Sequence, residues 1–397
     1  MFHGGEDAGL LLYMTRNTRT LFFYSCIALF AILAPLLIAY SFGYIFHPTT
    51  GLLEKTGGIF IKSKTPRISI FVDGTFIKET SYLSGGALLT DITPGTHRLR
   101  LEKSNYHSWS KTIVVEPMLV ADFRNVLLVH DPAPIATSTK DEIAMLRASI
   151  NTGSLRAAPP KETVSLSDFS APAASPSFFL NSKHNLIGKT ATTTQVLVSY
   201  VNSFSIVDGV PYFIDKSGFL GKVDPGTKHI TTIGRPGFYL SQTPAQFLKA
   251  PNGEIVILDA SGGLFLSDGS TNIQTITGGV RQFSFDSSGV KMLIQKDQSV
   301  DVLWLEDNPL QPFEQAGIRE QIFADESIIQ DADWFFGDDA HIVIRNADGI
   351  FFTDIDPRNG KNIIQLFEKK TDELVTVPAI PQSIFFRRGN VFYTISI

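Results

Sequence analysis

Cysteine is nearly absent from this sequence, in which Cys26 is the only one among 397 residues. A single cysteine excludes an intrachain disulfide and any zinc site built from several cysteines. Cys26 lies inside a long apolar run and precedes most of it, so packing, and not lipidation, is its expected role. A large secreted region without disulfides also favours a bacterial envelope over a eukaryotic one.

A basic surface is also lacking. The formal net charge is -5 and charged residues make up 18% of the chain, whereas nucleic-acid-binding domains typically carry a positive patch. The sequence contains no nucleophile elbow, phosphate loop or dinucleotide fingerprint in a strand-turn-helix context. We therefore expect no nucleic-acid partner, and the sequence indicates no catalytic residue and no cofactor.

Metal-binding patterns are missing as well. Asp215-Lys216-Ser217-Gly218 and Asp348-Gly349 resemble calcium loops, but they lack the spaced oxygen ligands and the closing glutamate of an EF-hand. Ordinary turns, in which Asp accepts from its own backbone and Gly takes a positive φ, explain them better. His184, His229 and His341 are scattered without paired ligand spacing. No metal site is predicted.

The longest stretch without charge runs from Leu21 to Phe46 and contains no Asp, Glu, Lys, Arg or His. It exceeds the roughly 20 apolar residues that a helix needs to cross a hydrocarbon core of about 30 Å. Pro35 lies near its middle, where a transmembrane helix tolerates a kink. Aromatic residues, which favour the headgroup boundary, gather at both ends: Phe22, Phe23, Tyr24, Tyr40, Phe42, Tyr44 and Phe46. We predict a transmembrane helix over residues 21–46.

A cleaved secretory signal is the alternative interpretation of this run. The apolar region of such a signal is usually only about 7 to 15 residues long, although Ala39 and Ser41 could form a cleavage signature. Arg16 and Arg19 precede the run and only Lys55 follows it closely, which favours a cytoplasmic N-terminus by the positive-inside rule. Residues 1–20 are too short to fold alone and are expected to form a cytoplasmic tail.

A period of two residues begins after the apolar run. Ile68, Ile70 and Val72 would face one side of a strand, and Asp73-Gly74 then supplies a hairpin turn. Pro94-Gly95 marks a second turn before another alternating segment. We predict a small antiparallel β-sandwich over residues 57–130.

The same stretch resembles the PEGA domain over about residues 57–129. The matching segments, in order and spacing, are Gly58-Ile59-Phe60-Ile61, Val72-Asp73-Gly74, Asp91 to Leu99, Asn105-Tyr106 and Ile113-Val114-Val115. Thr65-Pro66-Arg67-Ile68 stands where the tetrapeptide that names the family would lie, which is a departure from its pattern. The resemblance implies an interaction module of bacterial and archaeal envelope proteins, often just outside a membrane anchor. It implies no catalytic residue.

Tyr106, His107 and Trp109 form an aromatic cluster in this region. Such rings can stack on a sugar or on a partner's side chain, and these three are our candidate partner contacts. The alternative is that they pack a strand and cover the edge of the sandwich. His97, in the Pro-Gly-Thr-His turn, is expected to be a turn or packing residue and not a ligand.

The composition shifts between residues 131 and 177, where Pro is interspersed with Ala, Ser and Thr. Such a segment is typical of a connector that cannot bury a core. Within it, Thr139-Lys140-Asp141-Glu142 is a capping box that predicts a short helix. That helix could dock on either neighbouring domain or serve as a spacer.

Residues 178–397 repeat a hairpin unit about every 45 residues. A turn dipeptide recurs next to short apolar strands, at Asp208-Gly209, Asn252-Gly253, Ser288-Gly289, Asp338-Asp339 and Arg388-Gly389. Repeated four-stranded units of this length are typical of a β-propeller, because one blade cannot cover its own apolar faces. We predict about five blades, with Trp304 and Trp334 in blade cores. A strand from Gln195 to Tyr200 is expected to complete the last blade.

One unit, Phe283 to Lys291, resembles the blade entry of WD40-like bacterial propellers. The sequence therefore predicts a mainly β protein with one N-terminal transmembrane helix, a PEGA-like sandwich and a propeller. Its expected role is a single-pass envelope protein, with the bulk outside the cell, that binds or scaffolds protein or wall-polymer partners. The alternative is an envelope hydrolase or lyase acting on glycans or peptides at the propeller axis. A receptor that passes ligand state inward is disfavoured by the short tail.

Overall fold

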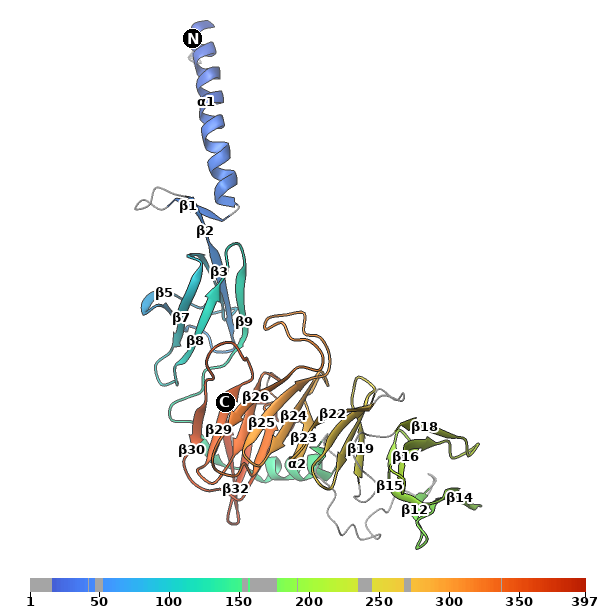
Figure 1. Cartoon of the computed structure of the whole chain (residues 1–397). Helices are drawn as coiled ribbons and strands as arrows, with labels where there is room; N and C mark the ends of the chain where they lie inside the picture. The colour runs from blue at the N-terminus through green and yellow to red at the C-terminus, as the bar shows by residue number, and fades with distance from the viewer. Residues whose placement is uncertain are drawn as a thin grey trace, which may run out of the picture.

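The computed structural model describes residues 16–41, 43–46, 53–151, 156–157, 177–190, 192–234, 245–267, 273–336 and 338–397. Most of the predicted tail (residues 1–15) and much of the predicted connector (residues 152–155 and 158–176) lie outside the described residues. A long helix leads into a two-sheet unit, which in turn lies against a row of small sheets (Figure 1).

Helix α1 (Arg16–Ser41) is long and apolar enough to cross a membrane, and Pro35 lies inside it. The predicted helix over 21–46 is present but its ends differ, and its crossing of a membrane stays a prediction. Gly43 has a φ of +75° and donates its N–H to the carbonyl of Tyr40 at 2.9 Å, and a glycine in this conformation terminates a helix. Tyr44 and Phe46 belong instead to strand β1 (Tyr44–Phe46), which pairs with β2 (Leu53–Lys55).

Two sheets share one hydrophobic core over residues 57–128, with strand orders β6-β3-β9 and β5-β4-β7-β8. The strands are β3 (Gly57–Ser63), β4 (Ser69–Val72), β5 (Thr75–Glu79), β6 (Gly86–Ile92), β7 (Gly95–Glu102), β8 (Trp109–Val115) and β9 (Val120–Val126). Ile68, Ile70 and Val72 are buried as the alternation predicted. The expected hairpin turn is present, with φ of 51° at Asp73 and 82° at Gly74.

One pairing in this unit contradicts the prediction of a purely antiparallel sandwich. Strands β3 and β9 run parallel, with Ile59 opposite Ala121 and Ile61 opposite Phe123. A parallel neighbour requires a long crossover. Here the chain enters the other sheet as β4 and β5, returns to form β6 beside β3, and enters the other sheet again as β7 and β8. The alternation of apolar residues sets which face of a strand is buried, but it leaves the direction of the neighbour open.

Six small sheets follow in the described part of the chain, in a propeller-like arrangement, and not the five that we predicted. Their strands are β12 (Ser177–Leu180), β13 (Leu186–Lys189), β14 (Thr194–Val198), β15 (Val201–Val207), β16 (Val210–Asp215), β17 (Leu220–Val223), β18 (Ile230–Gly234), β19 (Ala245–Lys249), β20 (Ile255–Asp259), β21 (Leu264–Ser267), β22 (Ile273–Thr277), β23 (Val280–Phe285), β24 (Lys291–Lys296), β25 (Ser299–Trp304), β26 (Arg319–Ala324), β27 (Asp331–Trp334), β28 (His341–Arg345), β29 (Ile350–Asp354), β30 (Ile364–Phe367), β31 (Glu373–Thr376), β32 (Ser383–Arg388) and β33 (Val391–Ser396).

The sheet that sequence reasoning missed is the first, β12-β13-β14. Its turn contains no glycine: His184 takes a φ of 58°, and the side chain of Asn181 accepts the N–H groups of Lys183 and Asn185. A search based on turn dipeptides with glycine does not recognise such a turn. Trp304 and Trp334 are buried in the fourth and fifth sheets, as predicted.

Neighbouring sheets in the row share hydrophobic clusters, so each sheet packs face to face on the next. Among the described residues, no such cluster joins the first sheet to the sixth. The expected completion of the last blade by Gln195 to Tyr200 is therefore wrong: Thr194 to Val198 form β14 and pair with β13 in the first sheet.

The predicted connector takes the place that we assigned to that strand. Strand β10 (Ile135–Thr137) pairs with β33 at the edge of the sixth sheet, and β11 (Arg156–Ala157) pairs with β23. Helix α2 (Lys140–Asn151) covers the outer face of the sixth sheet, where Leu146 packs with Val375 and Phe385. The sixth sheet thus has one edge paired by β10 and its outer face covered by α2, both from within the chain.

The capping box of α2 is confirmed. The side chain of Glu142 accepts the N–H of Thr139 at 2.6 Å, and the Thr139 hydroxyl accepts the N–H of Glu142 at 3.2 Å. These two reciprocal bonds satisfy backbone donors that a helix leaves free at its N-terminus. The helix, whose location the sequence left open, docks on the propeller-like row.

Candidate functional site

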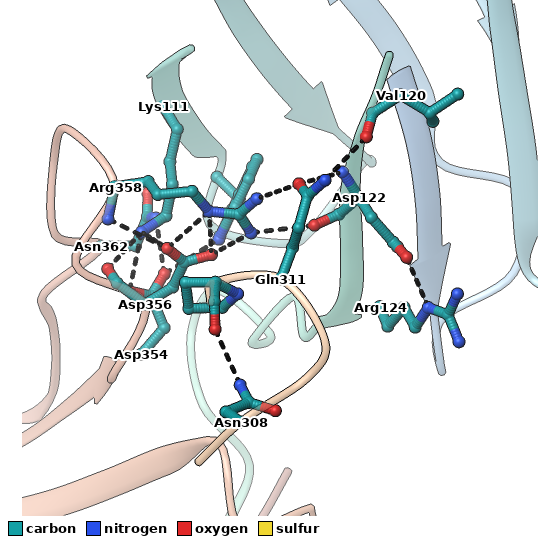
Figure 2. Close-up of polar contacts among 12 residues, drawn as sticks. Lys111, Val120, Asp122, Arg124, Asn308, Gln311, Asp354, Asp356, Arg358 and Asn362 are labelled. Carbon is teal, nitrogen blue, oxygen red and sulfur yellow. Dashed lines mark hydrogen bonds and ion pairs between the residues drawn. The ribbon is translucent and has the colours of Figure 1, made fainter. Parts of the chain in front are cut away.

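The two-sheet unit meets the fifth sheet and the segment after β25 through a polar junction, shown in Figure 2. We define the junction by Trp109, Lys111 and Asp122 on the two-sheet unit and by Gln311, Asp354, Asp356, Arg358 and Asn362 on the sheet row. Strands β8 and β9 are edge strands of their sheets, and free edges carry unpaired backbone N–H and C=O groups. Side chains from the sheet row bind these groups.

Lys111 is the centre of the junction. Its Nζ lies 3.1 Å from Asp354 Oδ1 and donates to the carbonyl of Asp356 at 2.7 Å, and its side chain is 0% exposed. The burial pattern of β8 places Lys111 on the same inward side as Trp109 and Ile113. A charge at an inward position of an apolar strand is costly unless it is paired, so β8 fits here only with the carboxylates of the sheet row beside it.

Asp354 joins three groups at once. Besides the Lys111 ammonium, its second oxygen accepts from Trp109 Nε1 at 3.1 Å and from Asn362 Nδ2 at 2.9 Å. The amide oxygen of Asn362 in turn accepts the backbone N–H of Ser110 at 2.9 Å. The edge of β8 is thereby closed by polar side chains from the β29–β30 region.

Gln311 closes the edge of β9 in the same way. Its side-chain amide donates to the carbonyl of Val120 at 2.8 Å and accepts the N–H of Asp122 at 2.9 Å. One side chain thus supplies the donor and the acceptor that a further strand would offer. Arg358 donates to Gln311 Oε1 at 3.0 Å and to the carbonyl of Asp122 at 2.9 Å, and its guanidinium lies 4.0 Å from the ring centroid of Phe123.

The structure separates the three predicted partner contacts. Trp109 is buried inside the junction and contacts Phe123 edge to face, so for this residue the prediction of an external contact is wrong and the packing alternative holds. Tyr106 packs against the core and contacts His130, with ring centroids 4.0 Å apart and the ring planes tilted by 32°. His107 donates its backbone N–H to Val129, and its ring lies 3.6 Å from Asp131.

An apolar groove of about 360 Å³ opens beside the junction. Its walls are the outer face of the β6-β3-β9 sheet and the segment that follows β25, with Phe60, Leu88, Val120, Asp122, Arg124, Pro309, Leu310, Gln311 and Phe313 as lining residues. Phe313 is 69% exposed. A concave apolar surface with a few polar groups at its rim is the usual form of a binding site.

Comparisons with known proteins found only solved structures of low similarity to this chain. No protein-family model and no curated protein matches the chain. Solved structures that match include the extracellular domain of a putative hybrid two-component system from B. thetaiotaomicron, with 11% identity over 57% of this chain and 39% of that chain and a TM-score of 0.29. An oligogalacturonate lyase in complex with manganese matches with 9% identity, 56% and 75% coverage and a TM-score of 0.32. A computationally designed protein, Ika8, matches with 12% identity, 86% and 100% coverage and a TM-score of 0.35. At these values the matches give no information about activity.

Elsewhere, the structure gives the predicted turn roles. Asp215 Oδ1 accepts the N–H groups of Ser217 and Phe219, so this segment is a capped turn. His97 bridges a turn by contacting Asp73 Oδ2 and the carbonyl of Thr93, each at 2.7 Å. Within the described ranges, no three His, Cys, Asp or Glu side chains are grouped so that they could hold a metal ion.

Three carboxylates, Glu314, Glu320 and Asp356, interact electrostatically near the junction, and they make the stability of the protein depend on pH. Burial raises the pKa of Glu320 to about 7, with further contributions from Glu314 and Asp356 that Lys361 partly opposes. A carboxyl whose pKa is higher in the folded state than its unfolded value of about 4.3 binds more protons when folded. Its contribution to stability is present at low pH and is lost as the pH rises toward 7.

We expect Glu320→Gln to remove this pH dependence. The full pKa shift corresponds to about 4 kcal/mol, which solvent screening of a partly exposed carboxyl reduces to about 1 kcal/mol. The variant should therefore unfold at a higher temperature than the wild type at pH 8 and at nearly the same temperature at pH 4, below the unfolded pKa of the carboxyl. Glu116→Gln, at an exposed glutamate, is the control. Equal effects of Glu320→Gln at the two pH values would contradict the prediction.

Proposed function

We propose that this protein is a single-pass, membrane-anchored binding or scaffolding protein of the cell envelope. Helix α1 anchors it, residues 1–20 lie in the cytoplasm, and the two-sheet unit and the propeller-like row stand outside the cell. The partner is a protein or a wall polymer that binds the apolar groove beside the junction. The resemblance of residues 57–129 to the PEGA domain and of the sheet row to WD40-like propellers is consistent with this role.

The observation that supports the proposal best is the construction of the junction. A buried Lys111 bound to Asp354, together with a Gln311 side chain that replaces a strand at the β9 edge, fixes the two-sheet unit to the sheet row. A flexible tether would need none of these buried polar contacts. Fixing the two parts also sets the groove between them, because its lining comes from both.

The proposal is tested by photo-crosslinking in intact cells. A photoreactive amino acid at Phe313, in the groove, should capture a discrete partner, because its side chain is exposed beside the other groove residues. The same amino acid at Ile328, which is also exposed but does not line the groove, is the matched control and should not capture that partner. A C-terminal epitope on the same protein should be removed by protease added to the intact cells.

The two readouts fail separately. Protection of the epitope in intact cells, with its loss only after lysis, would contradict the placement outside the cell. Removal of the epitope together with the same adducts at positions 313 and 328 would contradict the groove as the binding surface. An N-terminal epitope that no longer travels with the mature chain would show that α1 is cleaved and is not an anchor.

A further inference from the structure

The turn between β8 and β9, residues 116–119, carries exposed apolar side chains at the end of the two-sheet unit nearest α1. We call it the membrane-proximal turn. Met118 and Leu119 are 52% and 55% exposed. Met118 also has a φ of 64°, a left-handed conformation in which Asn and Asp are enriched and large side chains are uncommon. Neither burial within the chain nor backbone conformation therefore explains methionine here.

Hydrogen bonds tie this turn directly to the end of α1. Gly43 donates to the carbonyl of Tyr40 at 2.9 Å, Thr56 donates to the carbonyl of Gly43 at 2.8 Å, and Met118 donates to the carbonyl of Thr56 at 2.8 Å. Hydrogen-bonded neighbouring backbones lie about 4.8 Å apart, so two such steps keep the backbone of Met118 within about 10 Å of the residues that end the helix.

A glycine makes this close approach possible. A Cβ atom at Gly57 would lie 2.3 Å from the carbonyl oxygen of Glu116, which is closer than any real contact allows. Glycine at position 57 therefore lets the turn lie directly on the first residue of β3. The position of Met118 relative to α1 is built into the fold.

The length of α1 sets the depth of this turn. The helix has 26 residues, which at about 1.5 Å per residue span about 39 Å. The hydrocarbon core of a bilayer is about 30 Å thick, and about 40 to 45 Å with both headgroup layers. The helix therefore crosses the core and ends among the headgroups. At the same level Lys55 Nζ lies 5.6 Å from the ring centroid of Tyr44, and Tyr and Lys are residue types that anchor a protein at this boundary.

We infer that the membrane-proximal turn is a second membrane contact. The side chains of Met118 and Leu119 enter the boundary between headgroups and acyl chains of the bilayer that α1 crosses. This inference rests on the proposed anchoring by α1. The turn offers anionic lipids no positive charge, since its one charged residue, Glu116, is acidic and exposed. The contact is therefore made by the apolar side chains and does not depend on anionic lipids. With two attachment points, the two-sheet unit and the sheet row have a fixed tilt on the membrane.

Site-specific fluorescence tests this inference on the full chain in phosphatidylcholine vesicles. Cys26 is the only cysteine, so Cys26→Ser gives a background in which Met118→Cys, Leu83→Cys and Tyr24→Cys can each carry an environment-sensitive dye. Leu83 is 92% exposed. It lies two residues before Gly85, whose carbonyl accepts the N–H of Ser63 at the end of β3 away from α1. We expect phospholipids with a shallow spin label to quench the dyes at positions 24 and 118 and to leave position 83 unquenched, with a blue shift at 118 relative to 83.

Each pattern has one meaning. Quenching at position 24 without quenching at 118 would overturn the second contact and leave the anchor in place. Absence of quenching at 24 would overturn the anchor and the inference with it. The double variant Met118→Asp, Leu119→Asp, with the dye at position 120, should lose the quenching that the same dye shows without the two substitutions. Its unfolding temperature should change little, because both side chains are more than half exposed. Retained quenching at position 120 would show that α1 alone holds the turn near the membrane. It would contradict insertion of the Met118 and Leu119 side chains.

Discussion

Replacing Lys111 with alanine should lower the free energy of unfolding by about 3 to 5 kcal/mol, because it leaves a buried carboxylate without its partner. Asp354 would keep only its bonds from Trp109 and Asn362. The change should also loosen the edges of β8 and β9. Hydrogen exchange at the backbone amides of Ser110 and Asp122, which now bind Asn362 and Gln311, should become faster than in the wild type.

Two variants make this prediction specific. Lys62→Ala removes an exposed lysine from the same unit and should change stability by less than about 0.5 kcal/mol. Lys111→Met combined with Asp354→Asn removes both charges and keeps an acceptor for Trp109, so it should recover most of the loss. A Lys111→Ala variant as stable as Lys62→Ala, with unchanged exchange at Ser110, would show that the junction does not hold the two parts together.

Trp334→Ala should cost a similar amount, about 3 to 5 kcal/mol, because it removes a large buried side chain. Trp334 is 0% exposed and lies in the cluster between the fourth and fifth sheets. Its indole N–H donates to the carbonyl of Ser284 at 3.2 Å, and its own carbonyl accepts from the Thr376 hydroxyl at 2.8 Å. One residue thus contacts three successive sheets, and chemical denaturation should show a lower midpoint.

The matched control is Phe313→Ala, an aromatic residue that is exposed in the groove and should change stability by less than about 0.5 kcal/mol. Trp334→Phe keeps most of the packing and loses the hydrogen bond, so its effect should be intermediate. Because the fifth sheet also carries Asp354, Trp334→Ala should further speed exchange at Ser110. A midpoint equal to that of Phe313→Ala would contradict the packing of these sheets.

Local features of this fold could be predicted from the sequence because their causes are local. The alternation of Ile68, Ile70 and Val72 sets the buried face of β4, and the turn at Asp73-Gly74 follows from residues that tolerate positive φ. The capping box at Thr139 likewise needs only side chains within one helical turn. These signals gave the strand-rich architecture and the repeated hairpins.

The junction could not be predicted in the same way. Lys111 and Asp354 are 243 residues apart, and no periodicity indicates which carboxylate a buried lysine will meet. The sequence indicates only that Lys111 lies at an inward position of its strand, between Trp109 and Ile113. A buried ammonium group at such a position requires an acceptor or a carboxylate from another part of the chain. Gln311 offers no signal at all, because a glutamine that replaces a strand looks like any polar loop residue.

The pairing of β10 with β33 fixes the order in which this chain can finish folding. β10 precedes every other strand of the row in sequence, so the sixth sheet has no edge for β10, and no complete face for α2, until β33 has been synthesised. The first five sheets consist largely of hairpin neighbours and can form as they emerge, whereas this last step requires a long-range closure, which is slow. During that interval β10 and the apolar side of α2 are exposed to proteases and to other chains, so this part of the row becomes protected only when β33 pairs with β10.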